Sequence, residues 1–264
     1  MKQRVITGII AAALFLPIVI FGGFPFIIVT YILATIGLFE LLRMKRLRAF
    51  SPEGIIGFLL LWALLIPNTY AHWLESLNVT KSELFVLAVL LLLVYTVVTK
   101  NAFTFDEAGF LFLSILYVGF GFYYFMEIRF IGLAYMVYAL FTIWATDIGA
   151  YFIGRAWGKR KLWPEISPNK TVEGSIGGIV CAVIVAIVYQ LCTNLFDSFS
   201  ILIALTIVLS AFGQLGDLVE SAFKRHYGVK DSGNILPGHG GILDRFDSLL
   251  FIAPILSVFM NVVL

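Results

Sequence analysis

Most of the chemically active side chains in this sequence lie near its C-terminus, in residues 217–247. Nine of these 31 positions are Asp, Glu, Lys or Arg, whereas such residues make up 13% of the whole chain, and two of the three histidines lie here as well. Carboxylates can hold a divalent cation, and lysine and arginine side chains can hold phosphate groups. The mixture therefore predicts a site that brings anionic phosphates together around a metal ion.

Three aspartates are the expected metal ligands. Asp217 and Asp244 lie inside this stretch, and Asp147 lies earlier, in the apolar segment WATDIGAYF. Magnesium takes carboxylate oxygens together with the oxygens of substrate phosphates, so we expect Mg²⁺ or Mn²⁺, with a second ion left open. The alternative is that these carboxylates only form ion pairs with basic neighbours, namely Lys224, Arg225 and Arg245.

The spacing of the polar residues indicates that several of them share a helix face. In a helix, Ser221 and Lys224 lie four and seven residues beyond Asp217, on the same side. Asp244 and Asp247 are three residues apart and share a face in the same way. We therefore expect two polar helix faces to meet at one site.

The segment PGHGG, residues 237–241, is interpreted as a phosphate cradle. Gly238, Gly240 and Gly241 have no side chains, so their backbone N–H groups can approach an anion closely. His239 between them is expected to donate a proton or contact phosphate. An ordinary turn is the alternative.

A second basic segment, residues 154–178, contains the sequence SPNKTVEG. Lys170, preceded by Asn169, is expected to contact phosphate. It does not belong to a Walker nucleotide loop, because that motif requires G-x-x-x-x-G-K-[ST] after a strand, and no strand is expected here. The glycines that follow are expected to let helices pack closely, and they are Gly174, Gly177 and Gly178.

The elements that must position these residues are membrane helices. The 264-residue chain is 61% hydrophobic with a mean hydropathy of +0.99, which is far more apolar than a soluble domain. Its net charge of +2 is too small to indicate nucleic-acid binding, and Cys181 and Cys192, both in one apolar run, do not suggest a disulfide framework. The apolar run after Lys2 and Arg4 is longer than that of a signal peptide, so it is expected to be a retained first span.

Nine apolar stretches are long enough to cross a bilayer, and each must be helical because lipid offers no partner for backbone polar groups. The expected fold is therefore all-α, a polytopic membrane protein of about nine helices in one domain, 1–264, with its catalytic part at about 147–248. The expected spans are 5–22, 24–42, 54–72, 83–99, 109–127, 130–150, 174–195, 199–217 and 248–264.

The basic residues predict the orientation of these spans. With the N-terminus in the cytoplasm, all of the 18 Lys and Arg residues except Lys81 and Arg129 lie on the cytoplasmic side, as the positive-inside rule requires. We expect a multi-pass protein of the plasma (inner) membrane whose active site faces the cytoplasm. Glu40, near the inner end of the second span, is interpreted as a partner of Arg43 or Arg46.

The segment from Ser221 to Asp247, SAFKRHYGVKDSGNILPGHGGILDRFD, resembles the signature of CDP-diacylglycerol synthases, also called phosphatidate cytidylyltransferases. That signature reads S-x-x-K-R-x-x-x-x-K-D followed by P-x-H-G-G-x-x-D-R-x-D, and the segment matches it throughout. TDIGAYFIGR, SPNKTVEG and GQLGDLVES also resemble segments of that family. The motifs cover the second half of the chain, and the first five spans add only a general likeness.

The resemblance implies that CTP and phosphatidate react to give CDP-diacylglycerol and pyrophosphate with a divalent metal, and that Asp217 and Asp244 hold the metal. The expected partners are CTP, phosphatidate and membrane lipids, with a homodimer left open. Two other functions stay open, a different CTP-dependent lipid enzyme such as a polyprenol kinase and, as a weaker alternative, a transporter. The residues expected to be catalytic are Lys224, Lys230, Asp231 and Asp247. The residues expected to bind substrate are Asn169, Lys170, Ser221, Arg225, Gly238, His239, Gly240, Gly241 and Arg245.

Overall fold

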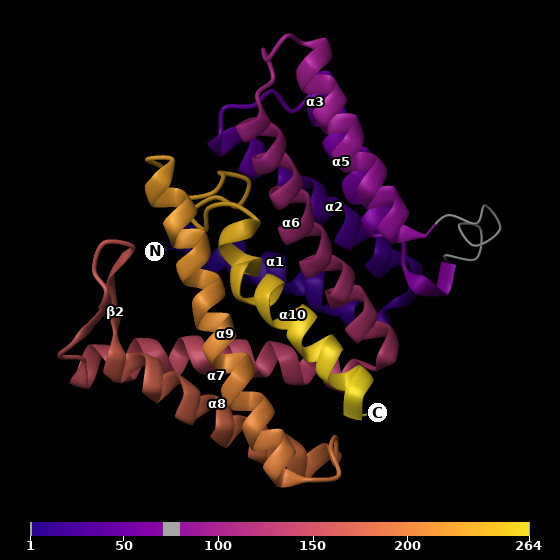
Figure 1. The fold of residues 1–264 in the computed structure, drawn as a ribbon. Coiled ribbons are helices and arrows are strands. Elements are labelled where there is room, and N and C mark those ends of the chain that lie inside the picture. Colours follow the sequence, from indigo (N-terminus) through magenta and orange to yellow (C-terminus); the bar gives the residue numbers. More distant parts are fainter. Residues whose placement is uncertain (1, 71–79, 264) are drawn as a thin grey trace.

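The computed structural model describes residues 2–70 and 80–263, and this part of the chain is almost entirely helical (Figure 1). The all-α polytopic class expected from the sequence is confirmed. The helices, in chain order, are α1 (Lys2–Phe21), α2 (Gly23–Met44), α3 (Pro52–Leu64), the 3₁₀ turn η1 (Asn68–Tyr70), α5 (Lys81–Val98), α6 (Phe105–Ile131), α7 (Leu133–Trp157), α8 (Val172–Thr193), α9 (Phe199–His226) and α10 (Leu243–Val263).

Local sequence explains where several helices begin. Helices α5 and α6 both begin with a capping box, at Thr80 and Thr104. In each, the threonine hydroxyl accepts the N–H of the glutamate three residues later, and the glutamate side chain accepts the threonine N–H in return. Thr171 caps α8 by accepting the N–H of Gly174. These polar ends belong at the surface of the bilayer, where the apolar runs stop.

Six of the described helices are long and apolar enough to cross a membrane, while α3 and the apolar part of α1 are shorter. The expected third span, 54–72, is represented by α3, which ends at Leu64 shortly before Pro67, and residues 71–72 lie outside the described residues. The eighth expected span, 199–217, is exceeded by α9, which continues to His226. Asp217 therefore lies within a helix and not at its end.

Helix α6 lies in the middle of the structure and packs against α2, α3 and α10 (Figure 1). Helices α7 and α8 run side by side as an antiparallel pair, and α9 crosses both of them before packing along α10. The polar parts of α7, α8 and α9 are thereby brought to one place.

Small residues let α7 and α8 approach closely, as the glycines of this segment predict. A side chain at Gly178 would collide with the carbonyl oxygen of Thr146 at 2.7 Å, and one at Gly177 would collide with Ile153. A side chain at Gly174 would collide with the carbonyl oxygen of Ala150 at 2.8 Å. The expectation of close helix packing at the start of α8 is confirmed.

The connection between α7 and α8 contains a short antiparallel hairpin, so the expectation of no strand in this segment is wrong. Strand β1 (Lys161–Trp163) pairs with β2 (Ser167–Thr171), and Lys170 lies on the second strand. A hairpin forms here because the connection lies outside the apolar spans. The Walker motif remains excluded, since the glycine pattern is missing.

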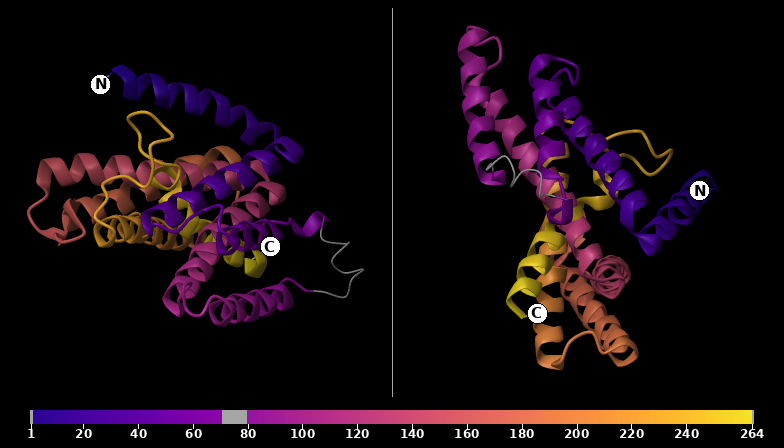
Figure 2. Two further views of the ribbon diagram at one scale, coloured as in Figure 1. Left: turned by 90° about the horizontal axis from the view of Figure 1, so that it is seen from above. Right: turned by 90° about the vertical axis from the view of Figure 1, so that its right-hand side faces the viewer.

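Helix α1 runs across the rest of the bundle and joins α2 at a sharp bend (Figure 2). Gly22 and Gly23 make this bend with φ angles of 66° and 60°, which glycine adopts without strain. Arg129 of α6 caps the end of α1, donating from Nε to the carbonyl oxygen of Val19 at 2.6 Å and from Nη2 to that of Ile20 at 2.8 Å. A charged donor at the C-terminal end of a helix satisfies carbonyls that have no partner inside it.

Candidate active site

A polar cavity of about 510 Å³ lies where α7, the start of α8, α9 and strand β2 meet. Helix α7 contributes Asp147 and Arg155, the hairpin contributes Lys170, and α9 contributes Asp217. Other polar side chains complete its lining, and they are Asn169, Thr171, Ser175 and Gln214. The cavity therefore has acidic and basic groups facing the same space.

Asp217 of α9 contacts the hairpin and the next turn of its own helix. Its Oδ2 lies 2.7 Å from Nζ of Lys170, and its Oδ1 accepts the hydroxyl of Ser221 at 3.2 Å. Asp147 opens on the same cavity from α7. The partner of Asp217 is thus Lys170, a residue absent from the three basic neighbours considered in the ion-pair alternative.

A second cluster lies one to two turns further along α9, around Lys224. Its Nζ contacts Oε2 of Glu220 at 2.5 Å and Oδ1 of Asp244 at 2.6 Å. The other oxygen of Asp244 accepts the N–H and hydroxyl of Ser232, at 2.8 and 2.9 Å, and the N–H of Gly241 at 2.7 Å. Both oxygens of Asp244 are therefore occupied by protein donors.

Asp247 follows Asp244 by three residues on α10. It lies against the stretch of α9 that carries Asp217, where a side chain at Gly216 would collide with the carbonyl oxygen of Asp247 at 2.7 Å. Its Oδ1 accepts the N–H of Ser248 at 2.7 Å. Of the three aspartates Asp147, Asp217 and Asp247, only the first two line the cavity.

The glycine segment is a tight turn, and the N–H of its last residue, Gly241, holds a carboxylate of the protein itself. Gly238 and Gly240 have φ angles of 79° and 84°, and Leu236 pairs with Gly240 across the turn. The N–H of Gly241 reaches Asp244. A side chain at Gly240 would collide with the Asp244 carboxylate, so these two residues can approach only because glycine stands there.

The remaining predicted residues lie around this turn and at its edges. Lys230 and Asp231 are exposed, as is Arg245, whose Nε donates to the carbonyl oxygen of His239 at 3.0 Å. The imidazole of His239 lies where a side chain at Gly8 of α1 would touch it at 3.3 Å. Thus the structure brings Asn169, Lys170 and the cavity aspartates together, but none of the four residues expected to be catalytic lines the cavity, namely Lys224, Lys230, Asp231 and Asp247.

Arg225 has a structural role in addition to the substrate contact expected of it. It lies in the last turn of α9, is exposed, and donates from Nε to the carbonyl oxygen of Ile166 at 3.2 Å. This bond joins the hairpin to the end of α9.

Two acidic residues were missed or misassigned from sequence. Glu220 is fully buried beside Lys224, and the only signal for it was its position four residues before that lysine on an otherwise apolar helix. The interpretation of Glu40 as a partner of Arg43 or Arg46 is wrong, because both arginines are exposed while Glu40 is buried. Glu40 instead accepts hydrogen bonds from the C-terminal segment.

The donors around the cavity fit a hard divalent cation. Among residues 2–70 and 80–263, no three acidic, histidine or cysteine side chains converge as a complete metal site. Magnesium needs fewer protein ligands, since it uses one or two carboxylates with substrate phosphates and water. Asp147 and Asp217 supply carboxylate oxygens at the cavity, where the ammonium group of Lys170 already pairs with one of them.

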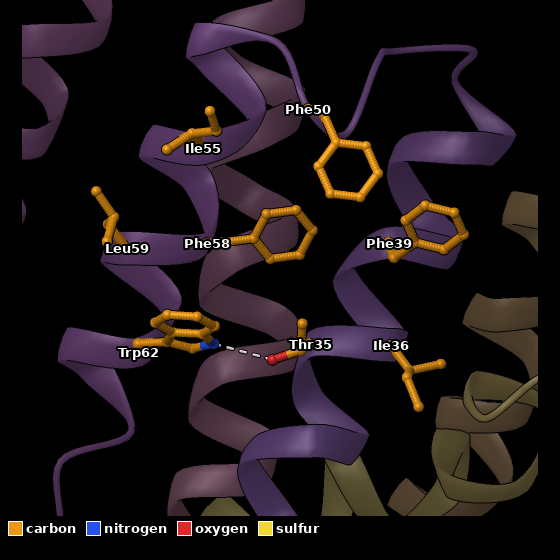
Figure 3. Close-up of a pocket in the computed structure, with 8 residues that line it drawn as sticks. All are labelled: Thr35, Ile36, Phe39, Phe50, Ile55, Phe58, Leu59 and Trp62. Carbon is orange, nitrogen blue, oxygen red and sulfur yellow. Dashed lines mark hydrogen bonds between the residues drawn. The ribbon is translucent and has the colours of Figure 1, made fainter.

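A separate apolar groove between α2 and α3 lacks the groups that phosphate chemistry requires (Figure 3). It has a volume of about 370 Å³ and is lined by apolar side chains except for Thr35 and Trp62, which bond to each other at 2.9 Å. It contains no charged lining residue. The polar cavity is therefore the candidate active site.

Comparison with known proteins gives a consistent result over the whole chain. The sequence profile described as the cytidylyltransferase family matches residues 2–263. The chain is 58% identical to the phosphatidate cytidylyltransferase of Bacillus subtilis (strain 168) over 259 residues, which cover 97% of this chain and 96% of that protein. It is 49% and 47% identical to proteins of the same name from Staphylococcus haemolyticus and Staphylococcus aureus (strain COL), over 98% of this chain and 99% of each relative.

The buried cluster around Lys224 generates the first prediction. Replacing Lys224 by Met leaves Glu220 and Asp244 buried without their cation, and the side chain of Lys224 is only 15% exposed. Breaking a buried ion pair in this way costs about 3–5 kcal/mol, so the free energy of unfolding in detergent should fall by that order. The exposed Lys230→Met variant is the matched control and should unfold like the unaltered protein. Equal stability of the two variants would show that Lys224 is not needed to balance the buried acids.

Proposed function

The chain belongs to the cytidylyltransferase family and transfers the cytidylyl group of CTP to phosphatidate, and on this premise we propose that the transfer takes place in the polar cavity between α7, α8, α9 and β2. The products are CDP-diacylglycerol, used in phospholipid synthesis, and pyrophosphate. The observation that carries the site assignment is the meeting of Lys170, Asp217 and Asp147 in one cavity. The reaction joins two anionic substrates, so it needs this combination of cationic and metal-binding groups.

We infer an in-line displacement at the α-phosphorus of CTP. An oxygen of the phosphatidate phosphate forms the new P–O bond, and the bond from the α-phosphorus to the oxygen of the β-phosphate breaks, releasing pyrophosphate. A phosphate monoester has a second pKa of about 6, so the attacking group is largely dianionic at neutral pH and needs no strong general base. The protein therefore contributes mainly position and charge neutralisation.

Individual residues can be given roles on this basis. Lys170, with Asn169 beside it at the rim of the cavity, is placed to hold the phosphates of CTP. Lys224, two turns after Asp217 on α9, balances the negative charge of Glu220 and Asp244. Exposed Arg225 and Arg245 are available to the phosphatidate headgroup at the bilayer surface.

Asp217 and Asp147 are the residues that we propose hold Mg²⁺, or Mn²⁺ in its place. When bound, the ion would polarise the α-phosphate and offset the charge that builds on the leaving pyrophosphate. Asp244, the third expected ligand, faces Lys224 and Ser232 in this structure. It could join the metal only if that lysine gave up its contact.

The protein is a multi-pass membrane protein, and we propose that its active site faces the cytoplasm. The distribution of basic residues supports this orientation under the positive-inside rule. The hairpin and the end of α9 both carry basic residues, and Arg225 bonds one to the other. A cytoplasmic site would receive CTP from water and phosphatidate from the inner leaflet.

The first test of this function follows the label of CTP. With CTP labelled at the α-phosphate, label should enter the lipid fraction only when phosphatidate and Mg²⁺ are both present. With CTP labelled at the γ-phosphate, the label should leave as pyrophosphate and none should enter lipid. Transfer of the γ-label to lipid would identify a kinase instead.

The second test measures metal binding through stability. Ligand binding to the folded state raises the melting temperature with ligand concentration, so Mg²⁺ added in the presence of CTP should stabilise the unaltered protein. Asp217→Asn and Asp147→Asn should each lose most of this Mg²⁺-dependent shift. Asp197→Asn, at an exposed position in the α8–α9 connection, is the control and should keep it. An unchanged shift in both cavity variants would remove these two aspartates as metal ligands.

The third test addresses orientation. In a variant without Cys181 and Cys192, single cysteines are placed at the exposed positions Glu165 in the hairpin connection and Asn234 before the glycine turn. Both should resist a membrane-impermeant thiol reagent in intact cells and react after the membrane is opened. Labelling of either cysteine from outside would contradict a cytoplasmic site.

A further inference from the structure

Glu40 of α2 binds a segment that lies about 200 residues later in the chain. Its side chain is almost fully buried, at 1% exposure. Oε1 accepts the N–H of Ile242 at 2.8 Å, and Oε2 accepts the N–H of Leu243 at 2.9 Å and the hydroxyl of Ser232 at 3.0 Å. One carboxylate thus connects the second helix to the turn that carries the family signature.

These bonds are what make the burial of Glu40 tolerable. An isolated carboxylate away from water is very costly, whereas one that receives several N–H groups is compensated. Leu243 is the first residue of α10, so its N–H and that of Ile242 have no partner within the helix. Glu40 therefore caps α10 from another helix, where the helix dipole also favours a negative charge.

The glycines of the turn fit this carboxylate closely. A side chain at Gly241 would collide with both oxygens of Glu40 and with Ser232, and one at Gly233 would collide with Glu40 alone. Gly37, one turn earlier on α2, lies against Leu243 in the same way, at 3.1 Å from an added side chain. The face of α2 that carries Gly37 and Glu40 is shaped to receive the start of α10.

Ser232 connects Glu40 to the cluster around Lys224, through Asp244. Its hydroxyl oxygen lies 3.0 Å from Oε2 of Glu40 and 2.9 Å from Oδ2 of Asp244. A hydroxyl has one proton, so it can donate to only one of the two carboxylates at a time. The positions of Glu40, Ser232 and Asp244 are therefore coupled, and Asp244 in turn contacts Lys224 at 2.6 Å.

We propose that Glu40 is a positioning residue for cytidylyl transfer, which fixes Asp244 and Lys224 through Ser232 and the start of α10. The inference rests on the proposed function only in placing Asp244 and Lys224 at the reaction. Glu40 itself touches no cavity residue given a substrate role. Its contribution is to hold the glycine turn, residues 237–241, against α2, so that Asp244 and Lys224 keep one arrangement on the part of α9 that follows Asp217.

The test compares Glu40→Gln with a matched variant at the other end of the bundle. Glutamine has the size of glutamate but turns one acceptor into an N–H₂ group that faces N–H donors. Gln190→Ala is the control, because Gln190 is also buried and also binds a connection, through the N–H of Phe196 at 3.0 Å and its carbonyl oxygen. Both variants should lower the melting temperature.

Of these two variants, only Glu40→Gln should lower kcat. The loss should be about 100-fold, because a displacement of reacting groups by about 1 Å can cost that much. The KM for CTP should change little, because the Asn169 and Lys170 side of the cavity stays in place. Ser232→Ala should lower kcat as well, and the double variant should be no worse than Glu40→Gln alone, as residues acting through one contact are not additive. Equal kcat losses in Glu40→Gln and Gln190→Ala, or additive losses with Ser232→Ala, would overturn the proposal.

Two further variants keep the outcomes separate. If Glu40→Gln does not fold, Ser232→Ala alone decides the matter, because it removes the connection and leaves the backbone bonds of Glu40 in place, and normal kcat would reject the positioning role. Asp244→Asn tests the site assignment itself. Full activity of Asp244→Asn would reject the placement of the reaction, whereas its inactivity beside an active Glu40→Gln would reject only the role of Glu40.

Discussion

The C-terminal half of the structure depends on the ion pairs that Lys224 forms with two buried carboxylates. Two buried carboxylates, Glu220 and Asp244, reach this one ammonium group from α9 and from the start of α10. A buried charge without a partner of opposite sign is very costly in a low-dielectric interior. The two helices and the turn between them must therefore keep the arrangement that pairs these carboxylates with Lys224.

The sequence predicts well those features that lipid alone determines. Apolar stretches must be helical where water is missing, and for that reason the all-α class was predictable. The clustering of Asp217, Lys170 and Asp147 was only partly predictable, because their types indicated phosphate chemistry while the pair formed by Asp217 and Lys170 depends on how α9 crosses the hairpin. The hairpin itself was missed, since strands of three and five residues leave no periodic pattern.

The two buried glutamates show most clearly what a single sequence cannot provide. Glu220 lies in an apolar helix and Glu40 near a run of arginines, so local charge pairing suggested the wrong partner for Glu40. Its actual partners are separated from it by 192 to 203 positions. The family motifs lie in the second half of the chain, yet the structure shows that a residue of the second helix helps to form the same unit.

The cap that Arg129 places on α1 has a consequence for the order of events during synthesis. The carbonyl groups of Val19 and Ile20 receive their partner from a residue made 109 to 110 positions later. At about 5–20 residues per second, the first helix waits roughly 5–20 seconds before that arginine exists. During this interval the two carbonyls need water as their partner, so the end of α1 must stay at the bilayer surface until α6, the third long apolar helix of the described chain, has been inserted.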